Sequence, residues 1–301
     1  MHLEHHPKDQ VMKLTRKQAL KTMAAGTLAT ISVPAFSAAL DKLTPLSLVG
    51  NVNHSVCRWC YQNIPLEQLC EAAKGMGLKS VELLGPNEWP VAIKYGLTCA
   101  MSNGSPLGIP RGFNDTANHE QLLKDFSDVI PKAADHGIRN VICFSGNRNG
   151  MDDKVGLENC ARGLDPVVKL AQKYNINIVM ELLNSKVNHP DYMCDYTPWG
   201  VALCEKLGSE NFKLLYDIYH MQIMEGDIIA TINKYHKYIA HYHTGGVPGR
   251  AEIDETQELY YPAIMKAIVK TGFKGFVAQE FIPKGADPLA SLKAGVKICD
   301  V

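Results

Sequence analysis

Four residues that can bind a metal ion or move a proton end short apolar runs in the second half of the chain. Glu181 ends Ile-Val-Met-Glu, Asp217 ends Leu-Tyr-Asp, His243 ends His-Tyr-His and Glu280 ends Val-Ala-Gln-Glu. A charged or imidazole group beside an apolar run is costly to bury unless it has a partner. Three carboxylates and one imidazole that meet at one place would suit a divalent cation.

We therefore predict a divalent metal site made by Glu181, Asp217, His243 and Glu280. Oxygen-rich ligation favours Mn²⁺ or Mg²⁺, and the histidine also admits Co²⁺ or Zn²⁺. His241 lies two residues before His243 on the same face of the run, and we prefer His243 because it lies nearer the carboxyl end. Isolated rim charges are the alternative, but four of them in successive runs indicate a shared function.

Polar side chains that can contact a substrate follow two of these runs. His220 comes three residues after Asp217, and Arg250 lies in the Gly- and Pro-rich segment after His243. The planar guanidinium group suits bidentate contact with a carboxylate or with sugar oxygens. We predict that His220 and Arg250 bind substrate, and a solvated loop arginine is the alternative for Arg250.

Candidates in the first third of the chain are less specific. Glu82 either joins the site or pairs with a lysine inside the core, and the sequence leaves both open. His54 and Trp59 are candidates for shaping a pocket. Cys57 and Cys60 form a lone C-x-x-C without a second pair for zinc, so we favour packing or loop positions over a disulfide or redox role.

The segments that must position these residues alternate between apolar runs and amphipathic stretches. The runs are apolar along their length, as in parallel strands that are covered on both faces. We predict strands at residues 46–52, 80–84, 97–101, 140–144, 177–181, 212–217, 239–243 and 275–280, each followed by a helical segment. This alternation predicts a single-domain (β/α)8 TIM barrel over residues 46–301, with catalytic residues at the carboxyl ends of the strands.

An open doubly wound sheet is the rival fold, but the first predicted strand lacks the glycine-rich phosphate turn that such a sheet would have. Residues 102–118 form a long stretch rich in Gly, Pro and Asn, which predicts a functional or mobile loop.

Residues 1–45 have the pattern of an export leader: a basic segment at 12–21, a small apolar run at 22–33 and a small-residue exit at 35–39. Residues 15–21 resemble a twin-arginine motif, with Lys17 for the second arginine and Ala19 for the usual phenylalanine. We expect cleavage, export to the periplasm and no stable membrane insertion afterwards. The alternative is an amphipathic helix on a cytoplasmic enzyme, with Met12 as the start.

The chain has 301 residues, with 31 basic and 31 acidic side chains. This balance supplies no basic surface for nucleic acid, and it argues against a metal-dependent endonuclease. We expect a small-molecule partner, a sugar or a hydroxy-keto acid, and leave homo-oligomerisation open.

The segments Glu-Leu-Leu-Asn at 181–184, Tyr-Asp-Ile-Tyr-His-Met-Gln at 216–222 and Val-Pro-Gly-Arg at 247–250 resemble hydroxypyruvate isomerase. That enzyme belongs to the xylose isomerase-like TIM barrel superfamily, which also includes ketose 3-epimerases. The resemblance implies that the four predicted ligands bind the metal and that Glu181 and Glu280 are also the acid–base pair. It further implies that His220 and Arg250 match substrate-binding positions.

The resemblance has departures that leave the substrate open. The isomerases often have Gln where this chain has His243, and the epimerases have a second Glu where it has Val187. The sequence Glu-Phe-Ile-Pro at 280–283 replaces the usual Glu-Tyr-Lys-Pro.

The resemblance implies a metal-dependent isomerase that works through a cis-enediolate and converts hydroxypyruvate to tartronate semialdehyde. The alternatives are a ketose 3-epimerase, an exported lyase or hydratase that acts on 3-keto-glycosides, and a sugar-binding barrel without catalysis.

Overall fold

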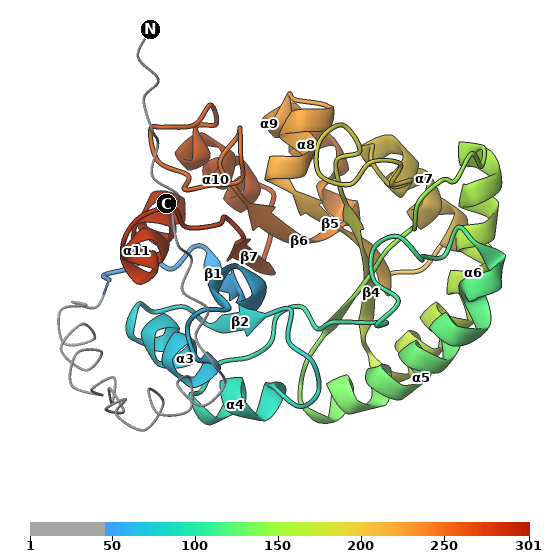
Figure 1. Cartoon of the computed structure of the whole chain (residues 1–301), viewed down its shortest axis with the longest axis horizontal. Helices are drawn as coiled ribbons and strands as arrows, with labels where there is room; N and C mark the ends of the chain where they lie inside the picture. The colour runs from blue at the N-terminus through green and yellow to red at the C-terminus, as the bar shows by residue number, and fades with distance from the viewer. Residues whose placement is uncertain (1–45) are drawn as a thin grey trace, which may run out of the picture. The chain divides into compact units, whose positions relative to one another are not determined.

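The computed structural model describes residues 46–301, which lie in one compact unit, so the leader predicted at 1–45 lies outside the described residues. Seven parallel strands form one sheet in the order β2-β1-β7-β6-β5-β4-β3. The helices pack around the outside of the strands (Figure 1). The fold is therefore the α/β, TIM-barrel-like fold that the sequence predicts, with one strand fewer in the described region.

The strands are β1 (Asn53–Cys57), β2 (Ser80–Glu82), β3 (Asn140–Cys143), β4 (Asn177–Leu182), β5 (Phe212–Asp217), β6 (Ile239–Thr244) and β7 (Phe276–Gln279). The α-helices are α3 (Leu66–Gly75), α4 (Trp89–Lys94), α5 (His119–Asp135), α6 (Asp153–Tyr174), α7 (Thr197–Leu207), α8 (Ile218–Met224), α9 (Ile228–Tyr235), α10 (Tyr261–Lys270) and α11 (Pro288–Cys299). Short 3-10 helices are η2 (Arg58–Tyr61), η3 (Thr116–Asn118) and η4 (His236–Tyr238).

The strand predicted at residues 97–101 is not a continuous strand. Thr98 and Ser102 make isolated parallel bridges, to Ser80 on β2 and to Val141 on β3. Between them, the Ala100 N–H donates to the Ser80 hydroxyl (2.8 Å) and its carbonyl accepts from the Asn140 side chain (2.8 Å). Because side chains replace backbone partners here, the ladder is interrupted. The segment still links the two edges of the sheet.

The first strand begins later than predicted. Residues 46–52 lie outside the sheet, and Val49 is 65% exposed. The strand is instead β1, which pairs with β7 through Asn53–Phe276 and Val56–Gln279. The apolar run at residues 46–52 therefore does not mark the strand. The strand instead contains the polar His54, whose buried side chain lies 3.4 Å from Asp300.

The interior of the sheet is apolar below the site. Met101, Ile142, Val179 and Leu215 form a buried cluster. Val179 and Leu215 lie two residues before Glu181 and Asp217, and alternate residues of a strand point to the same face. The carboxylates of β4 and β5 are therefore directed into the interior, at the carboxyl ends of the strands.

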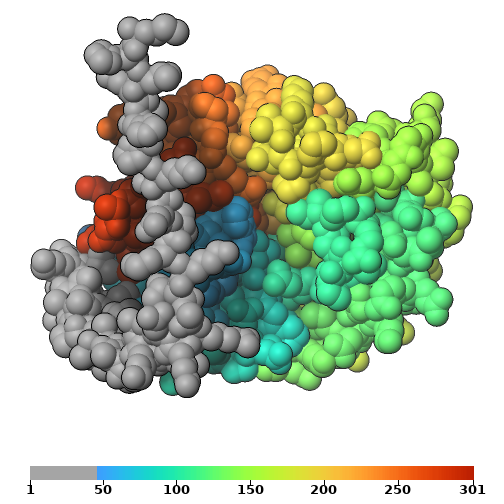
Figure 2. All heavy atoms as spheres, in the orientation of Figure 1, coloured from blue at the N-terminus to red at the C-terminus, as the bar shows by residue number. Residues whose placement is uncertain are grey.

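In the space-filling view, the green segments from the middle of the chain form a closely packed surface on the right of the molecule (Figure 2). In the part of the chain that the structure describes, no helix is both long and apolar enough to cross a membrane.

Candidate metal centre and active site

The four residues predicted as metal ligands come together in the structure. Glu181 lies in β4, Asp217 ends β5, His243 lies in β6 and Glu280 follows β7. One ligand atom from each lies within 4.8 Å of those of the other three, and all four residues are buried. The register of β5 and β6 places Asp217 directly beside His243. The sheet thus gathers donors that are far apart in the sequence.

Helix α8 begins directly after β5. The side chain of Asp217 caps it, because one carboxylate oxygen accepts from the His220 backbone N–H (3.2 Å). A cap of this kind satisfies one of the free N–H groups of the first helical turn. Capping fixes Asp217 and places His220 on the first turn of α8, beside the site.

Glu280 is the most strongly paired carboxylate of the centre. It accepts from the Trp59 indole N–H (2.7 Å), lies 2.5 Å from an Arg250 nitrogen and lies 2.7 Å from His243 Nδ1. Burial acts to raise the pKa of Glu280, but the positive charges of Arg250 and His243 outweigh it. The pKa is therefore held well below its usual range.

Glu181 and Asp217 differ from Glu280 in their balance of burial and charge. Burial is the largest influence on both and raises their pKa values, that of Asp217 strongly. Glu181 Oε1 has no hydrogen-bond partner and lies 3.4 Å from His243 Nδ1. Two carboxylates with different environments are the arrangement that acid–base chemistry needs.

The donor set fits a divalent cation. It consists of three carboxylates and one imidazole, an oxygen-rich set of the kind that Mn²⁺ and Mg²⁺ accept. Glu181 Oε1 is buried without a hydrogen-bond partner among the described residues. A buried carboxylate oxygen of this kind is suited to bind an ion.

The two residues predicted to bind substrate both lie at the site. Arg250 pairs with Asp217 (3.1 Å) as well as Glu280, and its guanidinium lies between the rings of Trp59 (5.0 Å) and Tyr219 (5.3 Å). These contacts show that Arg250 is not a solvated loop residue. It is 9% exposed and lines the central cavity.

The orientation of His220 is set by Asn184, to which the sequence assigned no role. The Asn184 side-chain oxygen accepts from the backbone N–H groups of Val187 (3.0 Å) and Asn188 (2.8 Å). Its NH₂ group therefore donates to His220 Nδ1 (2.6 Å). Burial and Arg250 lower the pKa of His220 well below its usual range. The neutral ring then carries its proton on Nε2, 3.5 Å from Asp217.

A cavity of about 340 Å³ opens over Glu181 and Glu280. Most of its walls are apolar, and the polar lining residues beyond the predicted set are Asn103 and His189. The lining is Trp59, Leu83, Asn103, Ile109, Ile142, Phe144, Glu181, Leu183, His189, Arg250 and Glu280. Trp59 therefore shapes the pocket as the sequence suggested. No sequence signal singled out His189, which lies in an irregular loop after β4.

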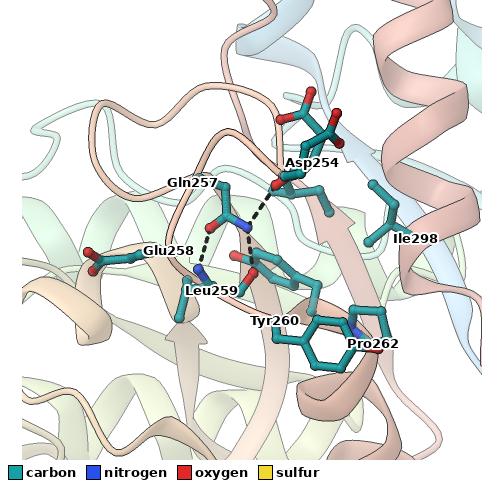
Figure 3. Close-up of a pocket in the computed structure, with 10 residues that line it drawn as sticks. Asp254, Gln257, Glu258, Leu259, Tyr260, Pro262 and Ile298 are labelled. Atoms are coloured by element: carbon teal, nitrogen blue, oxygen red, sulfur yellow. Dashed lines mark hydrogen bonds between the residues drawn. The ribbon is translucent and has the colours of Figure 1, made fainter.

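A second cavity of about 380 Å³ lies between the loop before α10 and Ile298 on α11 (Figure 3). Gln257 braces that loop through hydrogen bonds with Leu259 N–H (2.7 Å) and the Asp254 carbonyl (3.2 Å). None of the four clustered donors lines this cavity, so we place the chemistry in the first one.

The remaining candidates from the first third of the chain have structural partners. His54 pairs with Asp300 at the amino end of β1 and does not line the cavity. Cys57 and Cys60 are both free thiols. Glu82 does not pair with a lysine; its carboxylate contacts His241 (2.7 Å) and His243 (2.9 Å), so it reaches the site through His243, as the first of the two alternatives from the sequence has it.

Comparison with known proteins gives a consistent result. The xylose isomerase-like TIM barrel family model matches residues 70–299. The hydroxypyruvate isomerase of Escherichia coli is 32% identical over 227 residues, which cover 71% of this chain and 86% of that protein. The 2-oxo-tetronate isomerase of Cupriavidus necator is 28% identical and covers 71% of this chain and 85% of its own.

Among solved structures, an AP endonuclease of family 2 from Brucella melitensis superposes with a TM-score of 0.75. It is 22% identical and covers 82% of this chain and 99% of its own, so it supports the fold alone. The two sequence relatives are isomerases by name, which supports an isomerase activity.

Proposed function

The chain belongs to the xylose isomerase-like TIM barrel family, and we propose that it is an isomerase that moves a proton between adjacent carbons of a small α-hydroxycarbonyl compound. The observation that carries the proposal is the buried cluster of three carboxylates and one imidazole beside a cavity of about 340 Å³. Glu181, Asp217, His243 and Glu280 would hold a divalent ion, Mn²⁺ or Mg²⁺ in first place. Such an ion supplies Lewis-acid polarisation of the substrate carbonyl.

Glu181 and Glu280 would carry the proton. Glu280 already accepts hydrogen bonds from Trp59 and Arg250, whereas Glu181 Oε1 has no such partner. The less stabilised carboxylate is the more basic one, so we assign removal of the substrate proton to Glu181. The electron pair of the broken C–H bond then forms a cis-enediolate. Glu181 returns the proton to the neighbouring carbon, and the hydroxyl proton moves to the former carbonyl oxygen, with Glu280, as a carboxylate, able to accept and pass on that proton; the isomerisation is then complete.

Hydroxypyruvate is the first candidate substrate, with tartronate semialdehyde as its product. The similarity to the Escherichia coli enzyme supports it, and the Arg250 guanidinium offers a partner for the substrate carboxylate. His220, with its proton on Nε2, would donate to a substrate oxygen.

A ketose, or a 3-keto-glycoside, is the second candidate. The cavity of about 340 Å³ offers room for a sugar ring, and Trp59 and Phe144 offer apolar faces to it. The same proton transfer would then produce epimerisation or elimination. A sugar-binding barrel without catalysis would have no use for two differently paired carboxylates. Export to the periplasm, with the segment 1–45 as leader, would favour the glycoside.

Hydrogen exchange tests the proposal directly. The purified protein is stripped with a chelator, reloaded with Mn²⁺ and incubated in D₂O with hydroxypyruvate, fructose, tagatose or a 3-keto-glucoside. We expect deuterium at the carbon next to the carbonyl of one substrate, and loss of that exchange in Glu181→Gln and Glu280→Gln. Bound Mn²⁺ without exchange into any of the four would contradict the proposal and favour a binding protein.

A further inference from the structure

Glu82 lies beneath the metal centre, and nothing so far gives it a role. It ends β2, beside Cys57 of β1, and is fully buried. One oxygen of its carboxylate lies 2.7 Å from His241 Nε2 and 2.9 Å from His243 Nε2. Both histidines belong to β6 and point to the same inner face, because they are two residues apart.

The contact with Glu82 determines which nitrogen of His243 is free. An ionised carboxylate only accepts hydrogen bonds, so the nitrogen that faces it must carry a proton. His243 Nε2 faces Glu82, while Nδ1 lies 2.7 Å from Glu280 and 3.4 Å from Glu181. Without a cation, Nδ1 also faces a carboxylate and shares a proton with it. A cation bound among the three carboxylates would take the place of that proton, while the proton on Nε2 stays with Glu82 and leaves Nδ1 as the ligand atom.

We propose that Glu82 is a positioning residue of the metal centre, which holds the Nε2–H tautomer and the ring orientation of His243 so that Nδ1 serves as the metal ligand. This inference rests on the proposed function. It extends that function from the four donors to the group behind them. Carboxylates that hold the second nitrogen of a ligand histidine commonly raise its basicity and fix its plane.

A purely structural ion pair is the competing explanation, and the surroundings of Glu82 argue against it. Among the described residues, its ion-pair partners are the two histidines, with no lysine or arginine within range. A buried carboxylate without a permanent cation is a costly way to stabilise a core. His241 (2.7 Å) and the Cys57 thiol (4.0 Å) also contact this carboxylate oxygen of Glu82.

The first test measures Mn²⁺ affinity by electron paramagnetic resonance, without reference to activity. Glu82→Gln keeps the volume of the side chain and removes its charge, and we expect Mn²⁺ to bind about 10- to 100-fold more weakly. The matched control is His241→Phe, which removes the other partner of Glu82 and leaves the contact with His243. We expect its Mn²⁺ affinity to stay within about 3-fold of wild type, because the His243 tautomer is unchanged.

The outcomes separate the two levels of the proposal. Wild-type protein that binds no Mn²⁺ would overturn the proposed function together with the role of Glu82. Wild type that binds Mn²⁺ while Glu82→Gln binds it equally well would overturn the role of Glu82 alone. A structural pair would lower the thermal stability of both variants without a selective loss of affinity in Glu82→Gln.

A second measurement needs no variant and covers the case in which Glu82→Gln fails to fold. The wild-type protein is labelled with ¹⁵N at histidine and loaded with Zn²⁺, which is diamagnetic. We expect the His243 signals to show a protonated Nε2 and a metal-bound Nδ1. Metal-bound Nε2, or a proton on Nδ1, would overturn the assignment.

Discussion

At the scale of single residues, the centre depends on how each polar atom is paired. Glu280 is held ionised by the Arg250 guanidinium and the Trp59 indole, whereas Glu181 keeps an oxygen without a partner. Hydrogen bonds to a charged form stabilise that form, so these contacts separate two carboxylates that look alike in the sequence. In the same way, the hydrogen bond from the Asn184 NH₂ group determines which nitrogen of His220 carries the proton.

Trp59→Phe should lower kcat/KM about 10- to 100-fold, because it removes a hydrogen bond to a charged carboxylate worth roughly 1.5–3 kcal/mol and keeps a ring beside Arg250. Steady-state kinetics on the substrate found by exchange measure the change. The control is Trp89→Phe, which removes a buried indole bond to the Leu84 carbonyl (3.1 Å) outside the cavity. Equal losses of kcat/KM in both variants would contradict a role of the Trp59 contact.

Asn184→Asp should move the His220 proton to Nδ1, because a carboxylate oxygen in place of the NH₂ group accepts instead of donating. We expect kcat to fall at least about 10-fold, since Nε2 then has no proton to offer. The ¹⁵N shifts of His220 report the tautomer. Asn211→Asp removes an amide bond to the Ile176 carbonyl (2.8 Å) at the amino ends of the strands and should leave the shifts unchanged.

At the scale of elements, the loops after β3 and β4 are joined behind the site. The fully buried Tyr192 hydroxyl accepts from Ser145 N–H (3.1 Å) and donates to the Glu181 carbonyl (2.9 Å). This bridge ties the end of β4, and hence Glu181, to the neighbouring loop. The position of Glu181 in the site thus depends on a contact between two loops.

Tyr192→Phe should lower the free energy of unfolding by about 1–3 kcal/mol, because it leaves a buried backbone N–H without its partner. Urea denaturation of the metal-free protein measures this. Tyr174→Phe is the control, because Tyr174 is 40% exposed and such a surface change usually alters stability by less than about 0.5 kcal/mol. Equal effects of the two substitutions would mean that the hydrogen bonds of the Tyr192 hydroxyl contribute nothing to the free energy of unfolding.

At the scale of the whole molecule, the parallel sheet brings donors from four strands to one end. Glu181 and Glu280 belong to β4 and to the segment after β7, which lie three neighbours apart in the sheet order. A bound cation would link these strands directly. A ligand that binds the folded state alone stabilises the fold by mass action.

Mn²⁺ at about 100 times its Kd should therefore stabilise the folded protein by about 2.7 kcal/mol. For a domain of this size, that corresponds to a rise in Tm of roughly 5–10 °C, which EDTA should reverse. Calorimetry with and without the ion measures the shift. Asp217→Ala should lose most of it, and a rise of the same size in this variant would place the ion elsewhere.

The sequence by itself determined the alternation of strands and helices, because apolar runs and amphipathic segments report local burial. Strand β5 has the predicted bounds, residues 212–217. The sequence also singled out the four residues that cluster in the structure, because a charged or imidazole side chain at the end of an apolar run is conspicuous. That they meet was decided by strand order and register, which come from pairing between distant segments.

Tertiary structure alone decided the features that depend on side chains from other strands. The segment at 97–101 is interrupted because Ser80 and Asn140 take the backbone groups of Ala100. Glu82 faces two histidines because β6 and β2 converge on the interior, far apart in the chain. A polar side chain shows its charge in the sequence, but its partner, and hence its protonation and its role, exists only once the chain has folded.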